Sequence, residues 1–264
     1  MDMMTIGDVT LHYREEGDPK GAPIVFANSL GTDFRLWDKI IPLLPGGLRI
    51  LRFDKRGHGL SSCPQGRYAM TELVDETAQL MQALEFENSL FVGLSIGGLI
   101  GQGLAYQHPS LVKSLVISNS AARIGTVEMW QERIDVVQTG GIEALADPTM
   151  ERWFSNDFRS NRVEELSAWR NMLTRTPMAG YIGCSTAIAG SDFTESTATL
   201  KLPTMLIAGR EDGATPPDLM RGTADLIAGS RFELIENAGH LPCVEQPEEY
   251  ARLLGEFIVE TGHI

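Results

Sequence analysis

The stretch Ser89–Gly101, with the sequence SLFVGLSIGGLIG, constrains the fold more than any other part of the chain. Its apolar run Leu90–Val92 is typical of a buried strand, and the small residues that follow permit a very tight turn. The segment Gly93–Gly97 has the G-x-S-x-G spacing of a nucleophile elbow, in which a strained backbone exposes the serine hydroxyl above a sheet. A glycine-rich turn that merely contains a serine is the alternative. A base and an acid elsewhere in the chain must therefore support the catalytic interpretation of Ser95.

Segments with strand-like and helix-like patterns alternate on both sides of this stretch. Apolar or alternating runs predict strands at Val9–Arg14, Ile24–Ala27, Arg49–Asp54, Val112–Ile117, Thr204–Ala208 and Arg231–Ile235. Helical spacing follows at Trp37–Leu44, Leu73–Leu84, Ile96–Tyr106, Leu219–Ile227 and Pro247–Glu260. The turn Gly17–Gly21 after the first run predicts a short hairpin at a sheet edge. The alternation predicts an α/β fold, with a mostly parallel sheet covered by helices on both faces.

The alternation stops between residues 121 and 200, where the pattern is helical, rich in tryptophan and methionine, and without a convincing buried strand. We therefore predict a core domain of residues 1–120 and 201–264. Residues 121–200 are predicted to be an inserted helical cap. The cap is expected over the carboxyl edge of the sheet, where open α/β sheets bind ligands.

Composition limits the classes of partner and compartment. The net charge of −13 argues against nucleic acid, whose phosphates require a basic surface. No apolar run is long enough for a membrane span, and the amino terminus has no secretory pattern. Three cysteines, an odd number without a C-x-x-C pair, favour reduced thiols and a cytoplasmic protein.

His240 is the best candidate for the base that activates Ser95. Hydrolases with this elbow place the residues in the order serine, acid, histidine, and His240 follows the last predicted strand in the loop Asn237–His240. A surface loop histidine is the alternative. Of the other histidines, three are expected to be solvated or to cap elements: His12, His108 and His263.

The acid is expected at the end of a strand between Ser95 and His240, where it can accept the proton of the inner imidazole nitrogen. The loop Gly209–Pro217 offers Glu211 and Asp212. We choose Asp212 because a shorter side chain on a turn bounded by glycine and proline is easier to hold rigidly. Glu211 is expected to be solvated or paired with Arg210.

The oxyanion of an acyl-transfer intermediate needs backbone donors. One is expected to be the N–H of Ile96, directly after the nucleophile, and the other the N–H of Leu30 in the loop Asn28–Gly31. A plain strand-to-helix loop is the alternative for Leu30. Three further residues are expected to have structural roles. Arg56 and His58 should brace a tight loop, and Cys243, three residues after His240, should fill a small space in the core.

Five segments of the chain have the sequences of a known family: Asn28–Asp33, Arg56–Gly59, Gly93–Gly98, Ala121–Gly125 and Asp212–Pro216. On these segments the chain resembles the α/β-hydrolase superfamily along its whole length, and within it the 3-oxoadipate enol-lactonase family of the β-ketoadipate pathway. The resemblance implies an eight-stranded sheet with an inserted cap, a Ser95–His240–Asp212 triad, and hydrolysis of a small anionic enol-lactone to 3-oxoadipate. Such serine catalysis requires no cofactor, and no metal-binding or nucleotide-binding motif is present.

The free carboxylate of such a substrate needs a cation. Residues 120–200 contain seven arginines and no lysine, beside eleven acidic residues, so most of these arginines are expected to be surface charges. Trp130 and Arg133 stand three residues apart and share a predicted helix face, so we expect them to line the pocket, with Arg123 as the next candidate.

Two alternatives stay open on the same residues. One is another ester or lactone hydrolase, or a cofactor-free perhydrolase, on the same scaffold. The other is a lactone-binding receptor with little turnover. A homo-oligomer is compatible with the sequence, and neither a nucleic-acid nor a membrane partner is expected.

Overall fold

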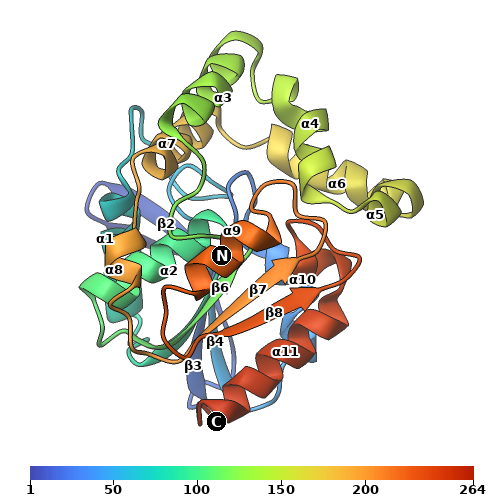
Figure 1. Ribbon diagram of the computed structural model, residues 1–264. Coiled ribbons are helices and arrows are strands. Elements are labelled where there is room, and N and C mark those ends of the chain that lie inside the picture. The colour runs from blue at the N-terminus through green and yellow to red at the C-terminus, as the bar shows by residue number, and fades with distance from the viewer.

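The computed structural model of residues 1–264 contains one eight-stranded sheet, in the spatial order β1-β2-β4-β3-β5-β6-β7-β8 (Figure 1). The strands are β1 (Asp2–Ile6), β2 (Val9–Gly17), β3 (Ala22–Ala27), β4 (Leu48–Phe53), β5 (Ser89–Leu94), β6 (Val112–Ser118), β7 (Thr204–Gly209) and β8 (Arg231–Ile235). All neighbours from β4 to β8 are parallel, whereas β1 pairs antiparallel with β2, and β2 with β4. The predicted mostly parallel sheet and α/β fold class are confirmed.

The central strands owe their position to continuous apolar sequence. Every residue of β5 and β7 is buried. A strand without an alternating polar face needs cover on both sides, which parallel sheets receive from their crossover helices. Figure 1 shows this cover: α1 (Met70–Ala83) and α2 (Ile96–Gln107) lie on one side of the sheet and α11 (Pro247–Glu260) on the other.

Six helices lie between β6 and β7: α3 (Val127–Gly140), α4 (Glu143–Trp153), α5 (Asn156–Asn161), α6 (Val163–Thr174), α7 (Met178–Ala189) and α8 (Thr194–Thr197). In Figure 1, α3 to α7 stand above one end of the sheet, beyond the carboxyl ends of the parallel strands. Two further short helices, α9 (Pro217–Ala224) and α10 (Pro242–Glu245), follow β7 and β8. No helix combines the length and the apolar character that crossing a bilayer requires.

Two local predictions are wrong. The edge hairpin is formed by β1 and β2 across Gly7, and the turn Gly17–Gly21 joins β2 to β3, which are separated by β4. The helix expected at Trp37–Leu44 is two 3-10 turns, η1 (Phe34–Trp37) and η2 (Ile41–Leu43). Pro42 has no backbone N–H to donate within a continuous helix, which explains the break.

Candidate active site

Ser95 occupies the turn between β5 and α2 in a strained backbone conformation, with φ 58° and ψ −116°. A Cβ at Gly93 would overlap the carbonyl oxygen of Gly97, and one at Gly97 would overlap that of Ala27. Both glycines are therefore required for the tight passage from strand to helix. The backbone N–H of Ser95 donates to Ser118 O at 2.9 Å, which anchors the turn to β6.

His240 and Asp212 are brought together at the same end of the sheet. Asp212 lies in the loop after β7, and His240 in the loop after β8. His240 Nδ1 is 2.9 Å from Asp212 Oδ2, and both side chains are buried. The backbone N–H of His240 also donates to Trp153 O at 2.7 Å, so the end of α4 holds this loop in place.

The carboxylate of Asp212 is surrounded by donors. Its Oδ1 accepts from the N–H groups of Ala214 at 2.7 Å and Thr215 at 3.0 Å. Its Oδ2 accepts from Thr215 Oγ1 at 2.7 Å and Asn119 Nδ2 at 2.8 Å, besides the contact with His240. Burial opposes the charged form, but the charge of His240 and these hydrogen bonds outweigh it and lower the pKa of Asp212. The acid is therefore held ionised and in one orientation.

Asn119 is a site residue that the sequence reasoning missed. It follows β6 with φ 43°, and its amide also donates to Gly239 O at 3.2 Å. An asparagine that directly follows a buried strand beside the nucleophile's strand is the signal that could have identified it.

Ser95 and His240 are not hydrogen-bonded to each other in this structure. His240 is bonded to Asp212, and Ser95 is bonded to Ser120. Ser95 O accepts from Ser120 Oγ at 2.7 Å, and Ser120 directly follows Asn119. The short β6 loop thus contacts both the nucleophile turn and the acid. In unliganded enzymes the bond between nucleophile and base is often long and shortens when substrate binds.

The two expected oxyanion donors have free N–H groups. Leu30 N–H donates to no protein acceptor, although its neighbour Gly31 donates to His58 Nε2 at 2.9 Å. Ile96 is the first residue of α2, and the first N–H groups of a helix have no partner within it. The loop after β3 and the start of α2 also lie beside each other, because β3 and β5 are neighbours.

His58 and Arg56 have the structural surroundings expected of them. His58 is fully buried, and burial together with the nearby Lys55 lowers the pKa of its imidazole, which accepts the Gly31 N–H. Arg56 Nε donates to Glu76 Oε2 at 3.0 Å, so it ties the loop to α1. Cys243 is fully buried, as expected of a core filler, and burial raises the pKa of its thiol.

The predictions for two histidines near the sheet are wrong. His12 is 9% exposed and lies 2.8 Å from Asp54 Oδ2, and His263 is 7% exposed with Nε2 2.8 Å from Pro23 O, so neither is solvated. Glu211 is exposed, which is the first of the two surroundings expected of it, because Arg210 pairs with Glu236 at 2.6 Å. Each partner comes from an element distant in sequence, which local pattern does not reveal.

Trp130 and Arg133 share a face of α3, as expected. The Arg133 guanidinium lies 6.0 Å from the Trp130 ring, and the Trp130 indole N–H donates to Ile124 O at 2.7 Å. Arg123 is exposed and lies 3.6 Å from Asp192, which supplies it with a carboxylate partner on the surface. The structure therefore separates Arg123 from the other two candidates.

Arg133 has no carboxylate partner, and a second unpaired arginine, Arg152 of α4, lies near it. Arg133 Nε donates to Tyr181 Oη at 2.8 Å, and Nη2 to Thr149 Oγ1 at 3.0 Å. Burial and the charge of Arg133 lower the pKa of Arg152. Two half-buried guanidinium groups that repel each other, in a chain of net charge −13, form a candidate anion site.

This pair of arginines is linked to the loops around Ser95. The backbone carbonyl of Arg152 accepts the Gly213 N–H at 3.2 Å, one residue from Asp212. The Tyr181 ring packs against Gly31. The candidate anion site and the free Leu30 N–H are thus separated by little more than one tyrosine side chain.

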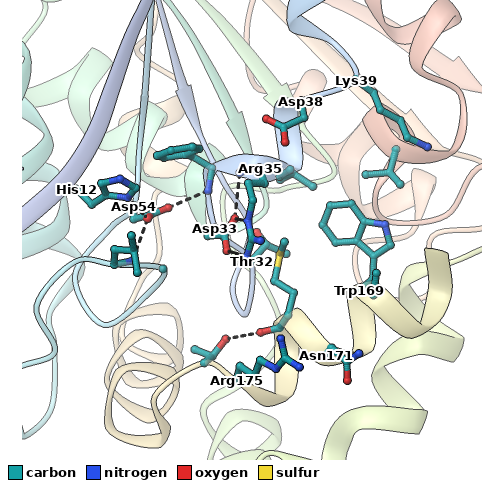
Figure 2. Close-up of a pocket in the computed structure, with 18 of the residues that line it drawn as sticks. His12, Thr32, Asp33, Arg35, Asp38, Lys39, Asp54, Trp169, Asn171 and Arg175 are labelled. Carbon is teal, nitrogen blue, oxygen red and sulfur yellow. Dashed lines mark hydrogen bonds and ion pairs between the residues drawn. The ribbon is translucent and has the colours of Figure 1, made fainter. Parts of the chain in front are cut away.

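A cavity of about 760 Å³ lies elsewhere, between the segment Thr32–Lys39 and α6 (Figure 2). Figure 2 shows His12 and Asp54 on one side of it and Lys39 and Trp169 on the other. Neither Ser95 nor Asp212 nor His240 lines it. Its walls carry internally paired charges, such as Lys39 and Glu165 at 2.6 Å. We therefore place the candidate chemistry at the strand ends and not in this cavity. No group of three or more His, Cys, Asp or Glu side chains is arranged to hold a metal ion.

Comparison with known proteins agrees with the fold described above. A family model described as the alpha/beta hydrolase fold matches residues 22–247. Two relatives from Acinetobacter baylyi, 3-oxoadipate enol-lactonases 2 and 1, are 31% and 33% identical over 249 residues, covering 94% of this chain and 93% of each relative. The resemblance to enol-lactonases expected from the loop sequences is confirmed.

Solved structures with a similar fold also include an enol-lactonase. The enol-lactonase from Burkholderia xenovorans LB400 has a TM-score of 0.94 at 33% identity, covering 98% of this chain and 100% of that chain. A thermophilic esterase from Thermogutta terrifontis has a TM-score of 0.92 at 25% identity, covering 99% of each chain.

Proposed function

The chain belongs to the α/β hydrolase family, and we propose that it hydrolyses 3-oxoadipate enol-lactone to 3-oxoadipate through an acyl-enzyme on Ser95. Family and relatives support a hydrolase of the ester and lactone type. The observation that carries the proposal is the buried His240–Asp212 pair, at the sheet edge where Ser95 stands in a strained turn. The same proposal places this reaction in aromatic catabolism, as the names of the enol-lactonase relatives imply.

In the acylation step, His240 removes the proton of Ser95 Oγ, and the oxygen attacks the lactone carbonyl carbon. Asp212 holds the imidazole with its proton on Nδ1 and stabilises the imidazolium that forms. The negative charge on the former carbonyl oxygen is received by the N–H groups of Leu30 and Ile96. Collapse of this intermediate breaks the ring C–O bond and leaves an acyl group on Ser95.

The leaving group of an enol-lactone makes this step undemanding. The expelled enolate is a weaker base than an alkoxide, and the imidazolium of His240 gives its proton to it, which yields the ketone. His240 is then neutral and removes a proton from water, which attacks the acyl carbon. The proton passes to Ser95 Oγ as the acyl bond breaks, and the product acid ionises to a carboxylate. The same donors at Leu30 and Ile96 serve both steps, because both pass through a tetrahedral oxyanion.

We assign the substrate's free carboxylate to Arg133, beside Trp130, with Arg152 contributing its charge. Arg133 lacks a carboxylate partner, and the hydroxyls of Tyr181 and Thr149 fix its guanidinium plane. A guanidinium held in one plane suits bidentate recognition of a carboxylate. Arg123, already paired with Asp192, is not assigned to this role. In this proposal residues 121–200, which include α3 to α8, act as a cap that supplies specificity to the core.

A steady-state assay on enzymatically generated enol-lactone tests the proposal. Wild-type protein is expected to prefer the lactone strongly to 4-nitrophenyl acetate, and Ser95→Ala to abolish turnover while the circular dichroism spectrum stays unchanged. Preference for the aryl ester would favour another esterase of this fold. Binding of the lactone without sustained turnover would identify a receptor, and activity retained in Ser95→Ala would exclude the acyl-enzyme.

A further inference from the structure

Lys55 is a buried cation without an acidic partner. It lies in the loop after β4, and the residue is only 4% exposed. Its Nζ donates to Ser29 O at 2.7 Å and to Asn28 O at 3.3 Å, and no carboxylate oxygen lies within ion-pair distance. In a chain with an excess of acidic residues, a buried ammonium that contacts only carbonyl oxygens requires an explanation.

The main acceptor of Lys55 belongs to the same peptide group as the candidate oxyanion donor. Ser29 C=O and Leu30 N–H are the two ends of one planar trans unit, so they point in opposite directions. Lys55 Nζ occupies the carbonyl end at 2.7 Å, whereas the N–H end has no protein acceptor. Fixing the carbonyl therefore also fixes the direction of the free N–H.

Several neighbouring groups of this loop form hydrogen bonds of their own. The next N–H, that of Gly31, donates to His58 Nε2 at 2.9 Å, and Thr32 Oγ1 donates to Ser29 O at 3.0 Å. Asn28 Nδ2 spans the loop to Thr32 O at 2.7 Å. These bonds hold the loop in one conformation, in which the N–H of Leu30 has no protein acceptor.

We propose that Lys55 is a positioning residue for the oxyanion hole, which orients the Ser29–Leu30 peptide and polarises its N–H through a charged hydrogen bond to its carbonyl. A cation at the oxygen end withdraws electron density from the peptide and strengthens its N–H as a donor. Its effect is largest when an oxyanion lies at the other end, so it favours the transition state over bound substrate. This inference rests on the proposed acyl transfer at Ser95.

The charge state of Lys55 gives the proposal a pH signature. Burial lowers the pKa of Lys55 to about 8, against the weaker opposing influence of Cys184, Asp54 and Asp33. Burial keeps Cys184 a neutral thiol, with its pKa raised to about 12, and lowers the pKa of His58 well below its ordinary value. Of Lys55, Cys184 and His58, only Lys55 has a pKa near 8. As the pH rises through 8 the ammonium loses its proton, and kcat is expected to fall.

The test compares Lys55→Met and Lys55→Gln with Lys201→Met, an exposed control. The enol-lactone and neutral 4-nitrophenyl acetate each pass through a tetrahedral oxyanion at the same donors. Lys55→Met is therefore expected to lower kcat on either by about 10- to 100-fold, below the loss for removing a donor outright. KM is expected to change little. The Tm is expected to stay the same or rise, because an unpaired charge leaves the interior. Lys55→Gln, which keeps a donor without the charge, should fall between wild type and Lys55→Met.

The pH profile separates this role from a purely structural one. Wild type and Lys201→Met are expected to lose kcat with an apparent pKa near 8, and Lys55→Met to lack this descending limb. A flat wild-type profile from pH 7 to 9, or Lys55→Met with wild-type kcat, would overturn the inference while loss of activity in Ser95→Ala still supported acyl transfer. If Ser95→Ala stays active, the proposed function itself fails. If Lys55→Met does not fold, Lys55→Gln and the wild-type profile decide.

Discussion

The amide of Asn119 donates to Asp212 Oδ2 at 2.8 Å and to Gly239 O at 3.2 Å. One side chain at the end of β6 therefore holds both the acid after β7 and the loop that carries His240. Because both acceptors are buried, the amide takes the place of water that the carboxylate would otherwise bind.

Replacing Asn119 by glycine is expected to lower kcat by about 10- to 100-fold, since a hydrogen bond to a charged group contributes about 1.5–3 kcal/mol. Glycine tolerates the left-handed backbone, so only the amide is lost. Asn88→Gly is the matched control, because Asn88 has a similar backbone conformation, with φ 53°, at an exposed turn. Equal rates for the two variants would contradict the role of Asn119.

Asp212→Asn is expected to reduce kcat by about four orders of magnitude with little change in KM, as removal of the charge behind the base does in serine proteases. An asparagine amide facing His240 Nδ1 favours the wrong imidazole tautomer. Pre-steady-state kinetics with an aryl ester should show that acylation is slowed. A variant within tenfold of wild type would refute the assignment of the acid to Asp212.

The stability of the protein should depend on pH through Asp212. Its pKa is lowered by folding, so its stabilising contribution is complete above the ordinary value of 3.8 and is lost as the pH falls through the folded-state pKa. Urea unfolding of wild type and Asp212→Asn from pH 6 to pH 2 measures this. The difference in unfolding free energy, wild type minus variant, is expected to decrease below pH 4; a difference independent of pH would contradict it.

Gly97→Ala is expected to reduce the unfolding free energy by about 1–3 kcal/mol and to lower kcat, because its Cβ would overlap Ala27 O and displace the start of α2. Gly255→Ala is the control. Gly255 lies within α11 with open space around it, so alanine should stabilise the helix by up to about 1 kcal/mol. Thermal unfolding and the esterase rate check both, and an active, stable Gly97→Ala would disprove the tight-elbow argument.

Arg133→Ala is expected to raise KM for the anionic enol-lactone by about tenfold or more, from the loss of a charged hydrogen bond, and to leave KM for 4-nitrophenyl acetate unchanged. Arg170→Ala, in which an arginine paired with Glu143 and Asp147 is removed from the same span, should affect neither. An unchanged lactone KM in Arg133→Ala would show that another group binds the carboxylate.

The local pattern of apolar and polar residues was enough to predict most helices and strands of the fold. Buried runs such as β5 and β7 were recognisable because a strand covered on both faces must be apolar throughout. The edge strand β1 was missed, since its sequence DMMTI does not alternate regularly between apolar and polar residues, and most of these residues are exposed. Pro42 broke a segment whose apolar spacing alone indicated a helix.

By itself, the sequence determined the chemistry available at each strand end: a serine in a glycine-bounded turn, an aspartate after β7 and a histidine after β8. Only the tertiary structure decided which polar groups meet there. Asn119 and Asp212 are 93 residues apart, and Lys55 and Ser29 are 26 apart, yet sheet order makes them neighbours. Local pattern reports which face of an element is apolar, whereas contacts between loops depend on which strands lie side by side. The partners that orient Asp212 and the Leu30 N–H could therefore be identified only in the folded chain.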